Sequence, residues 1–313
     1  FVLAATNVKE KDLDPAILRA GRIERKIYIK RPNLQERADL FKFYLAKVKV
    51  DEKIDPNAWA RIAVGLTPSE IDSLIREAGL LALRNNRDTI SHPDMTEAYD
   101  RITIGSLSNS RYSEKEKTMT AYHEAGHAIM TYLIHPTDEV IKATIRARKD
   151  YLGYIYYRQA DDFEKGASNK EQELAKIKIS IAGYAAEKIV FGTVTTGVFG
   201  DFQHIMAYAH QMVWELGMGK SGLLGNFLSM GSQNGELFMS EKTKEVLDND
   251  VQDILQSCLK ETMETLTKHR DVLDFFTQEL LKKGDLQYDE IVAIFDRYGL
   301  KPASRPTERP STP

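Results

Sequence analysis

The stretch of this chain with the clearest chemistry is His123-Glu124-Ala125-Gly126-His127, in which two histidines stand four positions apart and a glutamate follows the first. On a helix, residues i and i+4 lie above one another on the same face, so both imidazoles can reach one metal ion. The carboxylate of Glu124 then stands where it can take a proton from a water on that metal. The pattern predicts a zinc peptidase site, with His123 and His127 as ligands and Glu124 as general base.

A helix must carry this motif, and the preceding sequence predicts one. Ser113 to Glu116 has the S-x-x-E form of a capping box, in which the two end residues satisfy free backbone groups at a helix start. Apolar residues then recur at helical spacing from Ala121 to Tyr132. A helix that begins near Ser113 therefore presents both histidines on one side.

A catalytic zinc normally has three protein ligands and a position for water, so a third ligand must come from elsewhere in the chain. The downstream candidates are Glu187, Asp201, His204 and His210. Asp201 follows a turn-rich segment at the start of a predicted helix, where Gly200 would leave room for close approach. His204 lies one turn further on the same face, so geometry alone leaves it open. Glu187 lies in an apolar helix, where a buried carboxylate needs a partner such as the N–H of a ligating histidine.

The composition of the chain limits the class of protein, the number of domains and the kinds of partner that can be expected. A chain of 313 residues with 42% hydrophobic and 28% charged residues is typical of a soluble globular protein of about two domains. The net charge of −3 gives no reason to expect a nucleic-acid partner. The single cysteine, Cys258, excludes an internal disulfide.

The start of the chain predicts a longer parent protein. The apolar run from Phe1 to Thr6 has the pattern of a buried strand already under way, with no initiator methionine. No segment has the apolar length to span a bilayer, and no signal peptide opens the chain. We therefore expect a soluble fragment whose upstream part, including any membrane anchor, lies outside this sequence.

Along the chain, helical and extended patterns predict two domains joined by a short polar linker. Strands are expected at 1–6, 23–29, 140–147 and 152–158. Helices are expected at 34–47, 55–63, 67–85, 93–103, 169–191, 201–216, 240–268, 270–283 and 287–297, besides the one that carries the histidines. The polar linker spans 106–112, the second domain spans 113–297, and the proline-rich residues 298–313 predict a disordered tail.

Several separated segments, in order along the chain, resemble the FtsH family of membrane-anchored, ATP-dependent zinc proteases. Ala4-Ala5-Thr6-Asn7 resembles the sensor strand of AAA ATPases, and Asp14 to Arg22 resembles their second region of homology. Ser113 to His127 resembles the start of the family's peptidase domain. Thr195-Thr196-Gly197 followed by Asp201 resembles the segment that supplies its third zinc ligand.

The resemblance assigns roles to particular residues. Asn7 would polarise the water that attacks the γ-phosphate of ATP. Arg19 and Arg22 would act as arginine fingers on the nucleotide of a neighbouring subunit, because a guanidinium stabilises charge on a transferring phosphoryl group. Asp201 would be the third zinc ligand, which leaves Glu187 a supporting role.

The fold that the resemblance implies is mainly α. It consists of a remnant of the AAA α/β subdomain over 1–30, a helical AAA lid over 31–105, the linker, and a mostly helical, zincin-like peptidase domain over 113–297. The phosphate-binding loop G-x-x-x-x-G-K-[ST] is absent from this sequence. The chain would therefore hold half an ATPase site and a whole peptidase site.

The implied parent is an ATP-dependent zinc metalloendopeptidase that degrades unfolded or membrane proteins, with Zn²⁺ in the peptidase site and ATP with Mg²⁺ in the ATPase. It would be a homohexamer anchored in a bacterial inner membrane or an organellar membrane, with the peptidase domain in the cytoplasm or the organelle interior. Two alternatives remain: a stand-alone zinc peptidase, and a non-proteolytic AAA chaperone or scaffold subunit. The complete H-E-x-x-H motif argues against the scaffold.

The chain also departs from the family pattern. Gly65 to Glu70 stands where the lid helix usually begins Gly-Phe-Ser-Gly-Ala-Asp, and Gly200 replaces an asparagine. The strand region that ends in Arg146-Ala147-Arg148 lacks the family's Pro-Arg-Gly ending. Because the strand edge beside a zincin site commonly holds the substrate backbone, we expect peptide binding to differ in detail in this divergent member.

Overall fold

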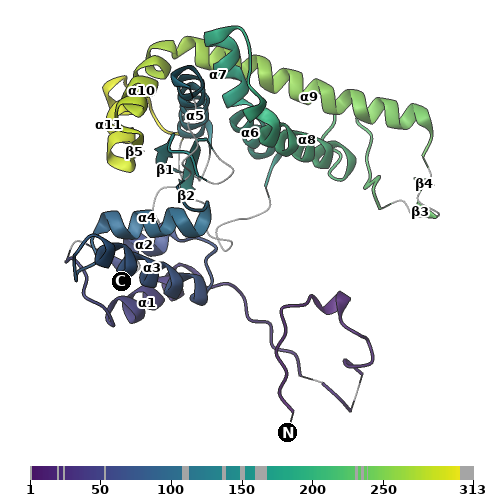
Figure 1. The fold of residues 1–313 in the computed structure, drawn as a ribbon. Coiled ribbons are helices and arrows are strands. Elements are labelled where there is room, and N and C mark those ends of the chain that lie inside the picture. The colour runs from purple at the N-terminus through teal and green to yellow at the C-terminus, as the bar shows by residue number, and fades with distance from the viewer. Residues whose placement is uncertain are drawn as a thin grey trace, which may run out of the picture.

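A computed structural model of the chain shows two helical domains and an extended N-terminal segment (Figure 1). The structure describes residues 2–19, 21–23, 25–52, 54–107, 113–135, 139–148, 152–158, 168–229, 232–233, 236–237 and 239–303. The mainly α fold predicted from the sequence is confirmed.

The first domain is a four-helix block. Its helices are α1 (Leu34–Leu45), α2 (Pro56–Ile62), α3 (Pro68–Arg84) and α4 (His92–Thr103). Helix α3 begins as its sequence predicts: the hydroxyl of Thr67 accepts from Glu70 N at 3.3 Å, and Thr67 N donates to the Glu70 carboxylate at 2.7 Å. Apolar side chains from all four helices, Phe41, Trp59, Leu74 and Met95 among them, form one buried core.

The second domain combines seven α-helices with short strands among the described residues. Its elements are α5 (Glu114–Ile134), β1 (Glu139–Thr144), β2 (Tyr154–Arg158), α6 (Lys170–Ser180), α7 (Ala182–Phe191), the 3-10 helix η2 (Thr196–Val198), α8 (Phe199–Trp214), β3 (Ser232–Gln233), β4 (Glu236–Leu237), α9 (Glu241–Lys268), α10 (Arg270–Lys283), β5 (Asp285–Gln287) and α11 (Tyr288–Arg297). The helix predicted at 169–191 is two helices, because Ile181 ends α6 and begins α7.

A three-stranded antiparallel sheet, in the order β2-β1-β5, lies against α5. The pairing of β5 with β1 brings together segments that are far apart in the chain, since Thr144 of β1 pairs with Asp285 of β5. The core of this domain is built around α5, where Ala125 and Ile129 pack with Phe276 of α10 and Phe295 of α11. Helix α5 is therefore held on several sides.

The strands predicted at 1–6 and 23–29 are not formed, and that prediction was wrong for the described residues. Residues 2–31 contain one short 3-10 helix, η1 (Glu10–Asp12), and otherwise no helix or strand where they are described. Leu3 and Ile29 are 87% and 93% exposed. A strand needs a neighbouring strand to satisfy its backbone groups, and no described residue pairs with this segment.

The segment predicted as a tail begins in contact with the second domain. Leu300 is buried, and Ala303 N donates to Tyr132 O at 3.1 Å. Residues 304–313, and 108–112 of the predicted linker, lie outside the described residues. Within the ranges described, no helix combines the length and the apolar character needed to cross a membrane.

Candidate metal site

Helix α5 places both histidines of the motif at one point. It begins with the predicted capping box, in which Ser113 N donates to Glu116 at 2.7 Å and the Ser113 hydroxyl accepts from Glu116 N at 3.2 Å. The Nε2 atoms of His123 and His127 lie 3.1 Å apart. Between them, Gly126 faces α7, and a Cβ there would lie 2.6 Å from Ala182 O. The glycine thus allows α5 and α7 to pack backbone against backbone.

His123 is oriented by Glu187 of α7. Its Nδ1 lies 2.8 Å from Glu187 Oε1, and the Glu187 carboxylate also accepts from Thr195 N at 2.6 Å and from the Thr195 hydroxyl at 3.1 Å. An ionised carboxylate can only accept, so Nδ1 of His123 carries a proton. The ring lies against Gly183, where a Cβ would lie 2.5 Å from each ring nitrogen. These contacts direct Nε2 of His123 toward the site.

His127 is oriented by the backbone of α6. Its Nδ1 lies 2.7 Å from Ile179 O. A carbonyl oxygen can only accept, so Nδ1 donates and the lone pair of Nε2 is directed into the site. The His127 ring is buried.

Asp201, in the first turn of α8, completes a group of three converging atoms. Its Oδ2 lies 3.1 Å from Nε2 of His123 and 3.4 Å from Nε2 of His127. This oxygen is buried and has no hydrogen-bond partner among the described residues. Three acceptor atoms at this separation repel one another unless a proton or a metal cation lies between them, and two imidazoles with one carboxylate suit zinc. Across the described ranges, this is the one group of three or more His, Cys, Asp or Glu residues whose ligand atoms all lie within 4.8 Å of one another.

The same geometry shifts the protonation of the ligands. Burial disfavours the charged form of His123, but the nearby carboxylates of Asp201 and Glu187 outweigh it and raise the pKa of His123 to about 10. Burial likewise disfavours the ionised form of Asp201, yet the two histidines beside it hold its pKa well below its usual range. A metal ion at Nε2 of His123 must replace a proton there, so zinc binding is coupled to proton release.

Glu124 lies beside this group and is buried. Burial raises the pKa of its carboxyl, against the opposing charges of His123 and His127. The backbone of Gly153, just before β2, touches the side chain: a Cβ at Gly153 would lie 2.7 Å from Glu124 Oε1. A carboxylate whose pKa is raised is a better base at neutral pH.

The other histidine candidates lie outside the group. His204 is exposed, and His210 stacks on Trp214 with ring centroids 4.7 Å apart. Gly200 borders open space, because a Cβ there would meet nothing within 4 Å, so the close approach expected at this residue stays a prediction.

Sequence reasoning missed the glycines that the site does require, Gly153 and Gly183, and the role of Gly126. One signal was available for Gly183. It lies four positions before Glu187 on the same helix, and so faces the same histidine.

The predicted nucleotide residues lie apart from the metal site, in the N-terminal segment. Asn7, Arg19 and Arg22 are exposed, and Arg22 donates to Ala16 O at 2.9 Å within its own segment. They are not members of the converging group.

Comparison with known proteins finds two family matches. Residues 110–294 match peptidase family M41, and residues 53–97 match the AAA+ lid domain. The first match contains all three converging residues together with Glu124.

The chain is also similar to curated proteins named as ATP-dependent zinc metalloproteases. The chain is 36% identical over 302 residues to the ATP-dependent zinc metalloprotease FtsH of Borreliella burgdorferi (strain ZS7), which covers 93% of this chain and 46% of the relative. It is 33% identical over 307 residues to the ATP-dependent zinc metalloprotease FtsH of Bacillus subtilis (strain 168), covering 95% of this chain and 47% of the relative. The chain thus spans about half the length of the curated relatives it matches.

Proposed function

This chain belongs to peptidase family M41, and we propose that it hydrolyses peptide bonds at the site formed by His123, His127, Asp201 and Glu124. The observation that carries the proposal is the convergence of two ring nitrogens and one carboxylate oxygen beside a buried glutamate. Zinc is the metal that fits this donor set.

Each residue has a distinct task in the reaction. Nε2 of His123, Nε2 of His127 and Oδ2 of Asp201 would hold a zinc ion, which would supply Lewis acidity at the scissile carbonyl and lower the pKa of a water molecule. Glu124 takes the proton from the attacking water and passes it to the leaving amine. Glu187 and the carbonyl of Ile179 keep the two imidazoles turned toward the metal.

Strand β2 is suited to hold the substrate backbone. It pairs with β1 on one side and forms an edge of the described sheet on the other. An extended peptide can pair with such an edge through main-chain hydrogen bonds. We infer that unfolded or membrane proteins enter here as extended chains.

We further propose that the parent protein couples this peptidase to ATP hydrolysis. The match of residues 53–97 to the AAA+ lid domain supports the proposal, as do the relatives' names as ATP-dependent zinc metalloproteases. Arg19 and Arg22 would act across a subunit boundary in a homohexamer, with ATP and Mg²⁺ bound by residues upstream. The parent would be anchored in a bacterial inner membrane or an organellar membrane.

The test separates metal binding from proton transfer. In the full-length protein, His123→Ala or His127→Ala removes a ligand and is expected to abolish zinc binding. Glu124→Gln removes only the base, so zinc is retained while casein degradation falls by about 10²–10⁴-fold. Zinc content by elemental analysis, measured beside cleavage, checks both. Cleavage at the wild-type rate by Glu124→Gln would refute the proposal, and zinc binding without cleavage in the wild type would favour a scaffold.

A further inference from the structure

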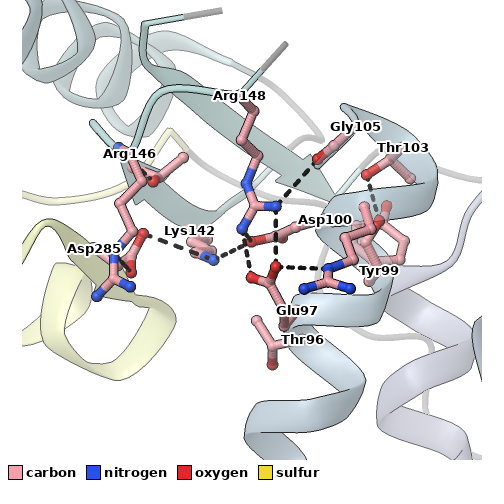
Figure 2. Close-up of polar contacts among 12 residues, drawn as sticks. Thr96, Glu97, Tyr99, Asp100, Thr103, Gly105, Lys142, Arg146, Arg148 and Asp285 are labelled. Atoms are coloured by element: carbon pink, nitrogen blue, oxygen red, sulfur yellow. Dashed lines mark hydrogen bonds and ion pairs between the residues drawn. The ribbon is translucent and has the colours of Figure 1, made fainter. Parts of the chain in front are cut away.

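The first domain, the lid, contacts the peptidase sheet through buried ion pairs (Figure 2). Asp100 of α4 accepts from Lys142 of β1 at 2.7 Å and from Arg148, which follows β1, at 2.9 Å. Arg148 also donates to Glu97 of α4 at 2.6 Å. We call these four residues, Glu97, Asp100, Lys142 and Arg148, the lid–sheet cluster.

The cluster is withdrawn from water at its centre. Asp100 and Arg148 are 1% and 2% exposed, and Lys142 is also buried. A buried charge is tolerated only when it is paired, and removing one partner leaves the other uncompensated. Arg148 donates in addition to Gly105 O, just beyond α4, at 3.1 Å. Each of these ion pairs joins the lid to the β1 region of the sheet. The position of the lid therefore fixes the position of the sheet.

Aromatic contacts extend the same interface to strand β2. Tyr99 of α4 lies against Tyr156 of β2, with ring centroids 5.7 Å apart, and Tyr156 meets Tyr154 edge-on at 5.0 Å. In the sheet register, Lys142 of the cluster is the partner of Tyr156. The lid therefore contacts both β1 and β2.

Strand β2 leads directly to the reaction site. Gly153 immediately precedes it, and the Gly153 backbone touches Glu124, since a Cβ there would lie 2.8 Å from Glu124 Cγ and 2.7 Å from Oε1. A displacement of β2 would change both the space beside the general base and the edge available to a peptide. None of the three converging metal-site residues belongs to the cluster.

We propose that the lid, through Asp100 and Arg148, positions strand β2 beside Glu124, which makes Arg148 a positioning residue for peptide hydrolysis; this rests on the proposed function. The lid then acts on the rate of cleavage and leaves zinc binding unchanged.

The experiment compares two arginines at the end of β1 in the full-length protein. Arg148→Met removes the positive charge of Arg148 from the cluster. The control Arg146→Met removes the same charge from a half-exposed side chain, which pairs with Asp285 at 2.7 Å; Asp285 is not a member of the cluster, although it lies 3.8 Å from Lys142. Asp100→Asn is a second, nearly isosteric cluster variant that decides the outcome if Arg148→Met does not fold. Zinc content, kcat and KM for an unfolded peptide, and hydrogen exchange of the β2 amides are measured for each.

With Arg148→Met or Asp100→Asn, kcat is expected to fall by about 10-fold to 100-fold, with full zinc content and faster exchange in β2. Arg148→Lys is expected to recover part of the rate, and Arg146→Met to match the wild type. Cluster variants with wild-type kcat and wild-type exchange would overturn the proposal, as would loss of zinc. If the wild type does not cleave peptides, the proposed function fails, while unchanged β2 exchange in the cluster variants would still refute the positioning role.

Discussion

In the peptidase domain, His123 and His127 each use one ring nitrogen for a fixed partner and direct the other toward Asp201. In the N-terminal segment, Arg19 and Arg22 are exposed, and the Arg22 side chain donates to the carbonyl of Ala16 in its own segment. Both regions carry motifs that resemble the same family. Only the peptidase motif is built into a site by the described residues.

The difference teaches what a motif leaves unspecified. H-E-x-x-H supplies ligand atoms at helical spacing, but the direction of each ring depends on residues elsewhere: Glu187 for His123 and the Ile179 carbonyl for His127. A segment without such anchors presents its side chains to solvent. Substitutions at these two anchors are therefore expected to weaken zinc binding, and substitutions in the N-terminal segment are expected to leave zinc binding unchanged.

The largest effect is expected at Asp201, which supplies the third ligand atom of the proposed metal site. Asp201→Asn replaces a carboxylate with a neutral amide, a poor zinc ligand, so zinc binding and peptide cleavage are both lost. His204→Ala, one turn later on the same helix, is the matched control and keeps both. Zinc content and peptide hydrolysis measure the pair, and retention of zinc by Asp201→Asn with its loss in His204→Ala would reverse the assignment.

An intermediate effect is expected at the anchor of His123. Glu187→Gln keeps the shape but weakens the hydrogen bond that orients the ring, so zinc affinity falls by about 10-fold to 100-fold. Glu171→Gln, at an exposed position of α6, serves as control. Competition with a chelator measures both affinities, and equal affinities would show that the ring needs no carboxylate anchor.

A smaller effect, on stability and zinc together, is expected from closing the space beside His123. Gly183→Ala places a methyl group 2.5 Å from each ring nitrogen, and such overpacking destabilises by about 1–3 kcal/mol. Gly200→Ala meets open space and is expected to stay within about 0.5 kcal/mol of the wild type. Chemical denaturation compares the two variants. Equal stability would mean that α7 can move away from His123 freely.

No effect on the peptidase is expected from the N-terminal arginines. Arg19→Ala and Arg22→Ala are expected to leave zinc content and peptide cleavage unchanged. In the full-length protein both substitutions lower ATP turnover, because each removes a guanidinium that would stabilise the transferring phosphoryl group. This chain alone is expected to show no ATP turnover, since it contains no phosphate-binding loop. ATP turnover by this chain alone, or loss of zinc in Arg19→Ala, would contradict the expected difference between the two regions.

The helices were predictable because their signals are local. Thr67 and Ser113 mark the starts of α3 and α5 through capping boxes, and both boxes form. The split at Ile181 was not predictable, since neither glycine nor proline stands there. The apolar runs at 1–6 and 23–29 indicated burial but not a neighbour, and a strand needs both.

His123, Glu124 and His127 were predictable from residue type and spacing, Asp201 from the resemblance to the family, and the residues that support them only in part. Glu187 was foreseeable as a buried carboxylate that needs a partner. The Ile179 carbonyl carries no residue-type signature, and the contact of Gly153 with Glu124 depends on the placement of β2. The lid–sheet cluster joins residues about fifty positions apart, so the sequence alone gave no indication of it.

The most direct test of the account is a crystal structure of the zinc-loaded protein with an anomalous difference map at the zinc edge. The account predicts one peak, about 2.0–2.1 Å from Nε2 of His123 and of His127 and about 2.0–2.2 Å from a carboxylate oxygen of Asp201. His204 would make no contact with it. A peak bound by His204 with Asp201 turned away, or no zinc between the two histidines, would contradict the account.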